Sequence, residues 1–222
     1  MNNKHFRIRT DRAEIFNCKN QPEGFTLIEL MIAMAVGLVV LSAVYAVFTV
    51  QNKELNKQEQ IAVMQQNARM AMDMMTREIM MAGYGRSAMT RCSGTTSTSS
   101  TTCVGITEAN ANSISFSTDL NDTGVLGGPN EYMSYDLYAS SGIQSLGRTA
   151  NGNRQPVVEN VSSLNFFYYD ASEMPTTNLA NIRRIQIVIT TQTANIDPVL
   201  GTVRTYTLTS NVTPRNLGLD GY

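Results

Sequence analysis

A long apolar run near the start of the sequence constrains the fold more than any other feature. The run Leu30–Val50 holds 21 residues and no charged side chain. As a helix it would be about 32 Å long, enough to cross the hydrocarbon core of a bilayer. One carboxylate, Glu29, stands directly before it. Because an unpaired carboxylate at the edge of a membrane span is costly, we expect Glu29 to have a partner.

Two ordinary segments share this apolar composition, a single-pass membrane anchor and a secretory signal peptide. The apolar region of a signal peptide is about 7 to 15 residues long and precedes a small-residue cleavage site. The present run is longer, although Ala43 and Ala46 resemble such a site. Neither segment accounts for the junction Gly24-Phe25-Thr26-Leu27-Ile28-Glu29 that precedes the run. The junction therefore needs a different explanation.

The junction resembles the cleavage and methylation signal of type IV prepilins and pseudopilins. Six matched positions lead directly into the apolar run. The resemblance implies that residues 1–24 are a cytoplasmic leader, which a prepilin peptidase removes by cutting after Gly24. It implies that Phe25 becomes the first mature residue and is N-methylated. It also implies that Glu29 takes part in charge pairing between subunits.

The distribution of charge predicts a cytoplasmic N-terminus. The leader carries five Lys or Arg residues and three Asp or Glu residues, a net charge of +2. Basic residues before a membrane span place that end of the chain in the cytoplasm. The remaining 198 residues have a net charge of −3 and no basic block, which argues against nonspecific nucleic-acid binding. We therefore expect a single span followed by one domain outside the inner membrane.

Histidine and cysteine usage narrows the chemistry of the chain. The only histidine, His5, and one cysteine, Cys18, lie in the leader. The chain after Gly24 thus has no imidazole for a Ser-His-Asp triad or a histidine metal site, and we predict no catalytic residues, no metal and no cofactor. Cys92 and Cys103 remain, and in an oxidising compartment they most simply form one disulfide. Two free thiols are the alternative.

The helix is predicted to cover residues 25–82, with 25–50 hydrophobic and 51–82 amphipathic. No proline interrupts it, and Gly37 is its only glycine. Apolar positions in the amphipathic half recur at spacings of three and four. They are Ile61, Met64, Ala68, Ala71 or Met72, Met75, Ile79 and Ala82. We interpret this stripe as a surface that packs against a sheet, with Gly83 as the C-cap of the helix.

Residues 83–222 are predicted to form a β-rich globular head. Residues 83–110 are predicted as a loop, with an exposed Ser/Thr-rich stretch closed by the two cysteines. Strand patterns, which indicate four to seven strands, follow at residues 113–117, 131–139, 143–148, 157–169, 182–191 and 204–209. Asn151-Gly152 predicts a tight turn. The expected class is α+β, an antiparallel sheet laid over the apolar stripe of one long helix.

Three segments of the head resemble segments shared by PilW-type minor pilins and J-type minor pseudopilins. They are Pro156–Asp170, Ile182–Ile187 and Thr213–Leu217. Met81-Ala-Gly-Tyr84 at the helix exit is more similar to the PilW type. Major pilins often carry a proline about two dozen residues into the mature helix, where this chain has Ala46 and no proline nearby. That difference favours a minor subunit.

The expected function is that of a PilW-like minor pilin, a structural subunit that helps to initiate assembly of a type IV pilus and lies near its tip. The resemblance implies as partners other minor pilins, the major pilin, the prepilin peptidase and the inner-membrane assembly platform. It implies a single-pass inner-membrane protein with a periplasmic head, later assembled into the extracellular fibre. One alternative is a J-type minor pseudopilin of a type II secretion system. Another is a membrane-anchored periplasmic enzyme or binding module, with Tyr132, Tyr135 and Tyr138 as a candidate ligand surface.

Overall fold

The computed structural model describes residues 24–85, 90–92, 103–197 and 200–217. These residues form one long helix, one short 3₁₀ helix and nine strands. The chain divides into two compact units between Gln51 and Asn52, so helix α1 (Leu27–Met80) contributes its first half to one unit and its second half to the other. Apart from Gly24, the predicted leader lies outside the described residues.

The N-terminal unit is helical from Leu27 onward and exposes its apolar side chains. Leu, Met and Ala, which are good helix formers, are frequent in this half of α1. Every large apolar side chain from Phe25 to Val50 is more than half exposed. Among the described residues, α1 is the one helix long and apolar enough to cross a membrane, with a mean hydropathy of 2.5 in its most apolar window. A continuous apolar surface of this size requires lipid or other protein around it.

The second half of α1 buries the predicted apolar stripe. Its buried residues are Met64, Ala68, Ala71, Met72, Met75 and Ile79. Their spacing of three and four places them on one face of the helix. The helix ends at Met80, and Gly83 follows three residues later with φ +80°, donating its N–H to the Ser117 carbonyl at 3.1 Å. Hydrogen-bonded turns continue to Ala82, so Gly83 takes the left-handed position that follows a helix and directs the chain toward the sheet.

The larger of two sheets has six strands in sequence order. They are β1 (Thr90–Arg91), β2 (Cys103–Ala109), β3 (Ile114–Ser117), β4 (Tyr132–Ser140), β5 (Ile143–Ala150) and β6 (Asn153–Glu159). β1 and β2 pair in parallel, and every other pair is antiparallel. The predicted turn at Asn151-Gly152 is confirmed: both residues have positive φ and join β5 to β6.

The smaller sheet has three antiparallel strands, β7 (Val161–Tyr169), β8 (Arg184–Gln192) and β9 (Thr205–Val212). The 3₁₀ helix η1 (Leu179–Asn181) precedes β8. The expectation of one strand pattern over residues 157–169 and of a single sheet is therefore wrong. Asn160, with φ +58°, separates β6 from β7, and its carbonyl accepts the Gln192 N–H at 2.8 Å. Asparagine tolerates this left-handed conformation, so the chain changes sheets within one residue.

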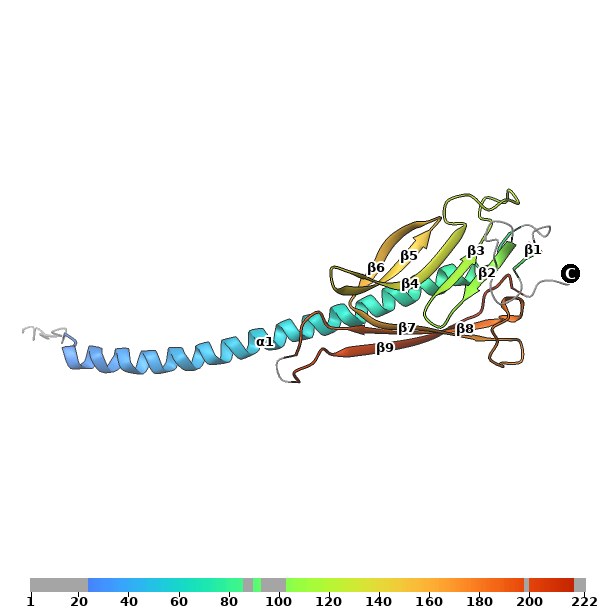
Figure 1. Cartoon of the computed structure of the whole chain (residues 1–222). Helices are drawn as coiled ribbons and strands as arrows, with labels where there is room; N and C mark the ends of the chain where they lie inside the picture. Colours follow the sequence, from blue (N-terminus) through green and yellow to red (C-terminus); the bar gives the residue numbers. More distant parts are fainter. Residues whose placement is uncertain (1–23, 86–89, 93–102, 198–199, 218–222) are drawn as a thin grey trace, which may run out of the picture. The chain divides into compact units, whose positions relative to one another are not determined.

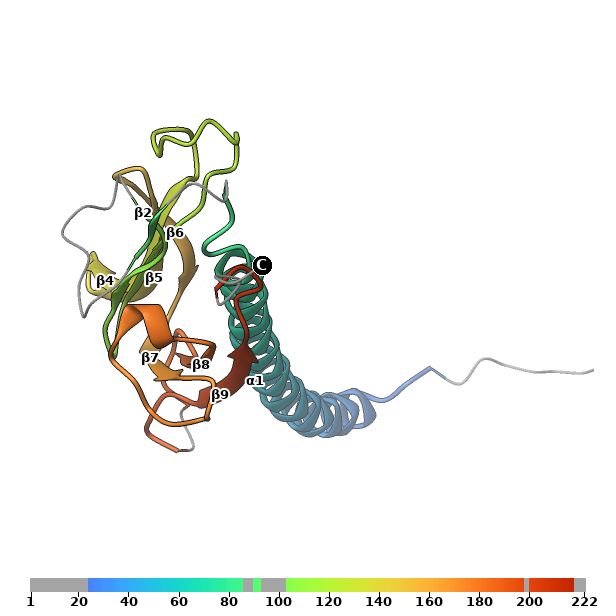
Figure 2. The ribbon, with the colours of Figure 1, turned by 90° about the vertical axis from the view of Figure 1, so that its right-hand side faces the viewer.

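The apolar core lies between the second half of α1 and the two sheets (Figures 1 and 2). In β8, Ile185, Ile187 and Ile189 are fully buried, while the residues between them are half-exposed. This alternation is what a strand with one face on the core requires. Met75 and Ile79 contribute from the helix side and are also fully buried. The predicted α+β class, a long helix with antiparallel sheet packed on its second half, is confirmed.

The prediction of a loop over residues 83–110 is wrong at its C-terminal end. Residues 103–109 form β2, and its first five residues are buried. The strand was hidden in the sequence because residues 103–107 are all buried, so they show no alternation of apolar and polar side chains, and the register shifts between Ile106 and Glu108. Gly105 has φ +129°. A Cβ added at Gly105 would lie 3.2 Å from Leu217 Cδ2, so the position also favours glycine for close packing.

Candidate processing and assembly site at the start of α1

The predicted cleavage site lies at the start of the N-terminal unit. Gly24, Phe25 and Thr26 precede the helix, which begins at Leu27. Phe25 is 88% exposed, and a Cβ added at Gly24 would meet no atom within 4 Å. The Gly24–Phe25 bond therefore lies outside regular secondary structure between two exposed residues, which is an arrangement that a peptidase can reach.

Thr26 and Glu29 form a capping box around the first turn of α1. The Glu29 N–H donates to Thr26 Oγ1 at 3.3 Å, and the Thr26 N–H donates to Glu29 Oε2 at 3.3 Å. The Thr26 hydroxyl also donates to the same carboxylate oxygen at 3.4 Å. These bonds satisfy N–H groups that the start of a helix leaves unpaired.

The capping box gives Glu29 a local partner that the sequence interpretation missed. The signal was present, because Thr26-Leu27-Ile28-Glu29 has the Thr-x-x-Glu spacing of such a box. The carboxylate lies at the N-terminal end of the helix, where the helix dipole favours negative charge. It is also the only charged side chain between Gly24 and Asn52. Its oxygen is bonded to the backbone nitrogen of Thr26, one residue after the position that cleavage would convert into an amino terminus.

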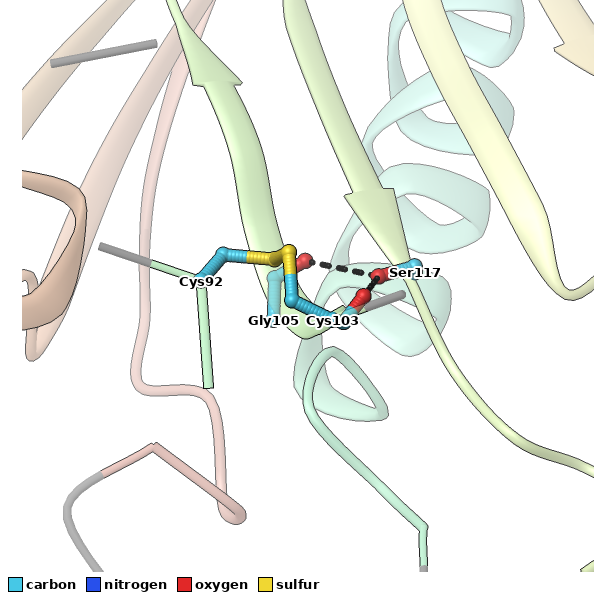
Figure 3. The surroundings of a disulfide bond; sticks show 4 residues. All are labelled: Cys92, Cys103, Gly105 and Ser117. Atoms are coloured by element: carbon cyan, nitrogen blue, oxygen red, sulfur yellow. Dashed lines mark hydrogen bonds between the residues drawn. A yellow bond between two sulfur atoms is a disulfide. The ribbon is translucent and has the colours of Figure 1, made fainter. Parts of the chain in front are cut away.

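The head contains a disulfide between Cys92 and Cys103, with their Cα atoms 5.0 Å apart (Figure 3). Both cysteines are buried. The Cys92 N–H donates to the Val104 carbonyl at 3.2 Å, and the Ser117 hydroxyl donates to the Cys103 carbonyl at 2.7 Å. The predicted Ser/Thr-rich loop between the cysteines lies outside the described residues. Among those described, the bridge attaches the short strand β1 to the edge of the sheet at β2.

A buried ionic cluster joins the last turn of α1 to the larger sheet. The Arg148 Nε donates to both carboxylate oxygens of Glu78, at 3.0 and 2.9 Å, and the Tyr135 hydroxyl donates to Glu78 Oε2 at 2.5 Å. Burial alone would lower the pKa of Arg148, but the hydrogen bonds and charge of Glu78 outweigh it and raise that pKa. Burial, reinforced by Glu78, raises the pKa of the Tyr135 hydroxyl far above its usual value. The cluster therefore fixes the last turn of α1 against β4 and β5.

Two buried carboxylates organise the loop between β3 and β4. Asp119 accepts the N–H groups of Thr123 at 3.1 Å and Gly124 at 2.8 Å. Glu131 accepts the Gly127 N–H at 2.8 Å. These oxygens are thus engaged by the backbone of the loop itself. Over the described parts of the chain, no three His, Cys, Asp or Glu side chains gather in a metal-binding group.

The three tyrosines of β4 do not share one surface. Tyr135 is fully buried and bonded to Glu78, whereas Tyr132 and Tyr138 alternate to the opposite face and are half-exposed. Tyr138 packs against the Arg154 guanidinium, 5.0 Å from the ring centroid. The structure therefore does not bring these residues together as a ligand surface.

Two family models match the chain. The model described as Prokaryotic N-terminal methylation motif matches residues 19–45, which include Gly24, Phe25 and Glu29. The model described as Prepilin peptidase-dependent protein B matches residues 57–213, more than half of the chain. The chain belongs to the prepilin peptidase-dependent protein B family. No curated protein and no solved structure matches it.

The two matches follow the division of the chain seen in the structure. The methylation motif lies in the N-terminal unit, and the family match begins at Lys57 in the second unit. It ends at Thr213, one residue after β9, so it includes the buried half of α1 and both sheets. Together with the α+β fold, the matches make this a type IV pilin-like protein, which confirms the predicted family.

Proposed function

We propose that this protein is a minor pilin of a type IV pilus, PilW-like, which helps to initiate assembly and is incorporated near the pilus tip. The observation that carries the proposal is the methylation motif, which leads directly into an exposed apolar half-helix. The apolar half-helix is buried first in lipid, where it forms a single membrane span. It is buried later among the helices of neighbouring subunits in the fibre. The role is structural, and no enzymatic activity is proposed.

Processing creates the charge that Glu29 needs. A prepilin peptidase cuts after Gly24, and the new Phe25 amino group is methylated but keeps its positive charge. The capping box holds the Glu29 carboxylate close to that end of the helix. In a bundle of apolar helices an unpaired carboxylate costs several kcal/mol, so Glu29 pairs with the Phe25 ammonium of a neighbouring subunit. This pairing selects axial register, and small residues such as Ala33 and Gly37 allow the helices to approach closely.

The proposed location follows from the same processing. Before assembly, the leader of residues 1–24 lies in the cytoplasm, residues 25–50 cross the inner membrane and the head, residues 83–222, is periplasmic. The assembly platform then moves the subunit into a fibre with the major pilin and other minor pilins. The disulfide between Cys92 and Cys103 fits an oxidising compartment of this kind.

A J-type minor pseudopilin of a type II secretion system is the second candidate. The segments Pro156–Asp170 and Ile182–Ile187 favour it as much as they favour a PilW-like pilin. The two candidates differ in the fibre that retains the subunit. Recovery of the tagged protein in sheared surface pili supports the pilus, and recovery only with the periplasmic secretion pseudopilus supports the alternative.

The proposal is tested first at the amino terminus of the mature protein. Mass spectrometry of the protein isolated from its host is expected to find N-methylphenylalanine at position 25. An intact leader, or a cut after Ala43 or Ala46, would leave the apolar run as an ordinary anchor or signal sequence and overturn the proposal.

A second test separates processing from assembly. Glu29→Ala is expected to retain cleavage after Gly24 but to reduce the amount of subunit in the sheared fibre fraction by at least about tenfold, the effect of a 1.4 kcal/mol loss. Glu59→Ala, which removes another exposed acid from the same helix, is the matched control and is expected to assemble normally. Normal incorporation of Glu29→Ala would contradict the proposed charge pairing.

A further inference from the structure

A cavity of 180 Å³ lies in the second unit between α1 and the hairpin that joins β8 to β9. Lys53, Lys57 and Gln60 line it from the helix, and Asn195, Asp197 and Arg204 line it from the hairpin. Gln60 Oε1 accepts the Asn195 N–H at 3.2 Å, which ties the two walls together. The site is thus a polar pocket with a formed rim, separate from the buried cluster at Glu78.

The charges around this pocket favour an anion. Arg204 donates to the buried Asp197 carboxylate at 2.6 Å, and Lys57 pairs with the exposed Glu54 at 3.1 Å. The hydrogen bond and charge of Lys57, with a weaker contribution from Arg204, lower the pKa of Glu54. No described residue pairs with the Lys53 ammonium. Three cations therefore stand against two carboxylates, and Lys53 has hydrogen-bonding capacity left for a ligand.

The pocket is close to the end of the apolar run by covalent connection alone. Lys53 is three residues after Val50, so their Cα atoms are at most about 11 Å apart however the chain bends. The polar headgroup region extends several ångströms beyond the hydrocarbon core of a bilayer. If residues 25–50 span the membrane, Lys53 lies at headgroup depth or just beyond it.

Exposed apolar side chains stand beside the basic ones. Ile196, which lines the pocket, is 63% exposed, and Leu200 on the same hairpin is 56% exposed. Apolar side chains next to lysines and an arginine are the composition of surfaces that lie at the boundary of headgroups and acyl chains. A free anion in solution would have no use for the apolar part of this surface.

We propose that this pocket binds the phosphate headgroup of an anionic phospholipid in the leaflet where α1 leaves the membrane. Lys53 and Lys57 contact the phosphate, the amide groups of the rim accept and donate hydrogen bonds to the headgroup, and Ile196 and Leu200 contact the acyl boundary. The bound lipid holds the head against the membrane before the subunit enters a fibre. The proposal rests on the proposed single span.

The chain contains no tryptophan, so a single introduced tryptophan is the only source of indole fluorescence. Leu200→Trp places one indole on the hairpin beside the lining of the pocket and keeps an apolar side chain at a position proposed to contact the acyl boundary. The full chain is inserted into phosphatidylcholine nanodiscs that contain a minor fraction of phosphatidylglycerol. Bromine atoms on lipid acyl chains quench tryptophan fluorescence on contact. One sample carries brominated phosphatidylglycerol, and the other carries the same mole fraction of brominated phosphatidylcholine. Stronger quenching by the brominated phosphatidylglycerol, at equal mole fraction, measures enrichment of the anionic lipid at the hairpin.

The expected result is an enrichment that falls about fivefold for each lysine removed in Lys53→Gln and Lys57→Gln and that weakens with added salt. Arg69→Gln with Arg77→Gln, exposed basic residues farther along the same helix, is the matched control and should leave the enrichment unchanged. Phe167→Trp, an exposed position on β7, should report no enrichment.

Three other outcomes would overturn the proposal. Equal quenching by the two lipids would mean that the pocket does not select an anionic headgroup. If inorganic phosphate abolished the enrichment, and if phosphate bound equally well to the protein in discs of pure phosphatidylcholine, the pocket would be a site for a free anion instead. Loss of enrichment in the variant with Arg69→Gln and Arg77→Gln would mean that the overall charge of the protein, rather than the pocket, attracts the anionic lipid. A chain that does not enter nanodiscs at all would contradict the single span, which is a failure of the proposed function rather than of the pocket.

Discussion

At the scale of single residues, two ion pairs that involve acidic residues of α1 differ in burial. Glu78 pairs with Arg148 of β5, and Asp73 pairs with Arg77 of the same helix. The Arg148 side chain is 8% exposed and that of its partner Glu78 is 22% exposed. The Arg77 and Asp73 side chains, whose charged atoms lie 2.6 Å apart, are 76% and 58% exposed. Removing one partner of a buried pair leaves the other charge without compensation. We predict that Arg148→Ala lowers the free energy of unfolding by about 3 to 5 kcal/mol.

The exposed pair supplies the control for that experiment. Arg77→Ala is expected to change the free energy of unfolding by less than about 1 kcal/mol, because solvent screens its pair with Asp73. Both values are measured by urea unfolding of the full chain in a nonionic detergent. Similar losses in the two variants would mean that the cluster at Glu78 is not a structural link between α1 and the sheet.

Two buried tyrosines predict how stability depends on pH. Burial raises the pKa of Tyr135 and Tyr168, with smaller contributions from the charges of Glu78 and Glu108 respectively. In the unfolded chain a tyrosine has a pKa of about 10. Above that pH the unfolded chain releases protons that the folded chain retains, so stability is full below about pH 10 and decreases above it by about 1.4 kcal/mol per pH unit for each tyrosine.

Substitution of one tyrosine isolates its share of this dependence. Tyr168→Phe removes the hydroxyl that donates to the Asn110 carbonyl at 2.8 Å, so the variant is expected to be less stable at neutral pH. The informative quantity is the slope of unfolding free energy against pH, which should become shallower by about 1.4 kcal/mol per unit above about pH 10. An unchanged slope in urea unfolding at several pH values would show that the folded chain does not retain the Tyr168 proton.

At the scale of elements, the disulfide holds a strand too short to persist alone. β1 has two residues, and among the described strands it pairs with β2 alone, in parallel. Cys92→Ser with Cys103→Ser is expected to lower the free energy of unfolding by about 2 to 3 kcal/mol, since the bridge closes a short loop. Amide hydrogen exchange should also speed up at Cys92, whose N–H bonds the Val104 carbonyl. Cys18→Ser is the control when all variants are measured as the uncleaved chain, and an equal effect from it would contradict the role of the bridge.

The elements that sequence reasoning predicted are those with uninterrupted periodicity. The stripe from Met64 to Ile79 repeats every three or four residues, and Ile185, Ile187 and Ile189 repeat every two, so local spacing alone indicates which face is buried. β2 was missed because it is buried on both faces and carries a bulge between Ile106 and Glu108, so its sequence does not alternate. The change of sheet was missed because it depends on the backbone conformation of Asn160.

The candidate site divides in the same way. Gly24, Phe25 and Glu29 could be proposed from the sequence because they stand within six consecutive positions of one motif, and their roles stay predictions. The cluster of Glu78 with Arg148 was not, because the two residues are 70 positions apart and meet only when β5 packs on α1. The capping box of Thr26 and Glu29 is intermediate. The Thr-x-x-Glu spacing is present in the sequence, but Glu29 was interpreted only as a membrane-edge charge that pairs with another subunit, so its hydrogen bonds to Thr26 were not predicted.

At the scale of the whole molecule, the proposed function makes removal of residues 1–24 the step that converts a membrane protein into a fibre subunit. In the uncleaved chain the backbone nitrogen of Phe25 is an uncharged amide, and residues 1–24 carry a net charge of +2, which the proposed topology keeps in the cytoplasm. We predict that Gly24→Asp blocks cleavage and leaves the protein in the membrane fraction at its full mass. The effect should lie in recognition by the peptidase rather than in folding, because a Cβ at Gly24 meets no atom within 4 Å.

The measurement is the intact mass and the membrane or fibre fraction of the variant in the host. Gly37→Ala, at another glycine with open space around its Cα, is the matched control and should be cleaved and assembled normally. Comparison with Glu29→Ala then separates cleavage from docking. The Gly24→Asp protein is expected to stop before cleavage creates the Phe25 ammonium, and the Glu29→Ala protein is expected to be cleaved but not to dock. A Gly24→Asp protein whose mature N-terminus is still Phe25 would mean that the peptidase does not read this position. Uncleaved protein found in sheared fibres would mean that the new ammonium is not required for docking, and the pairing with Glu29 would then lose its physical basis.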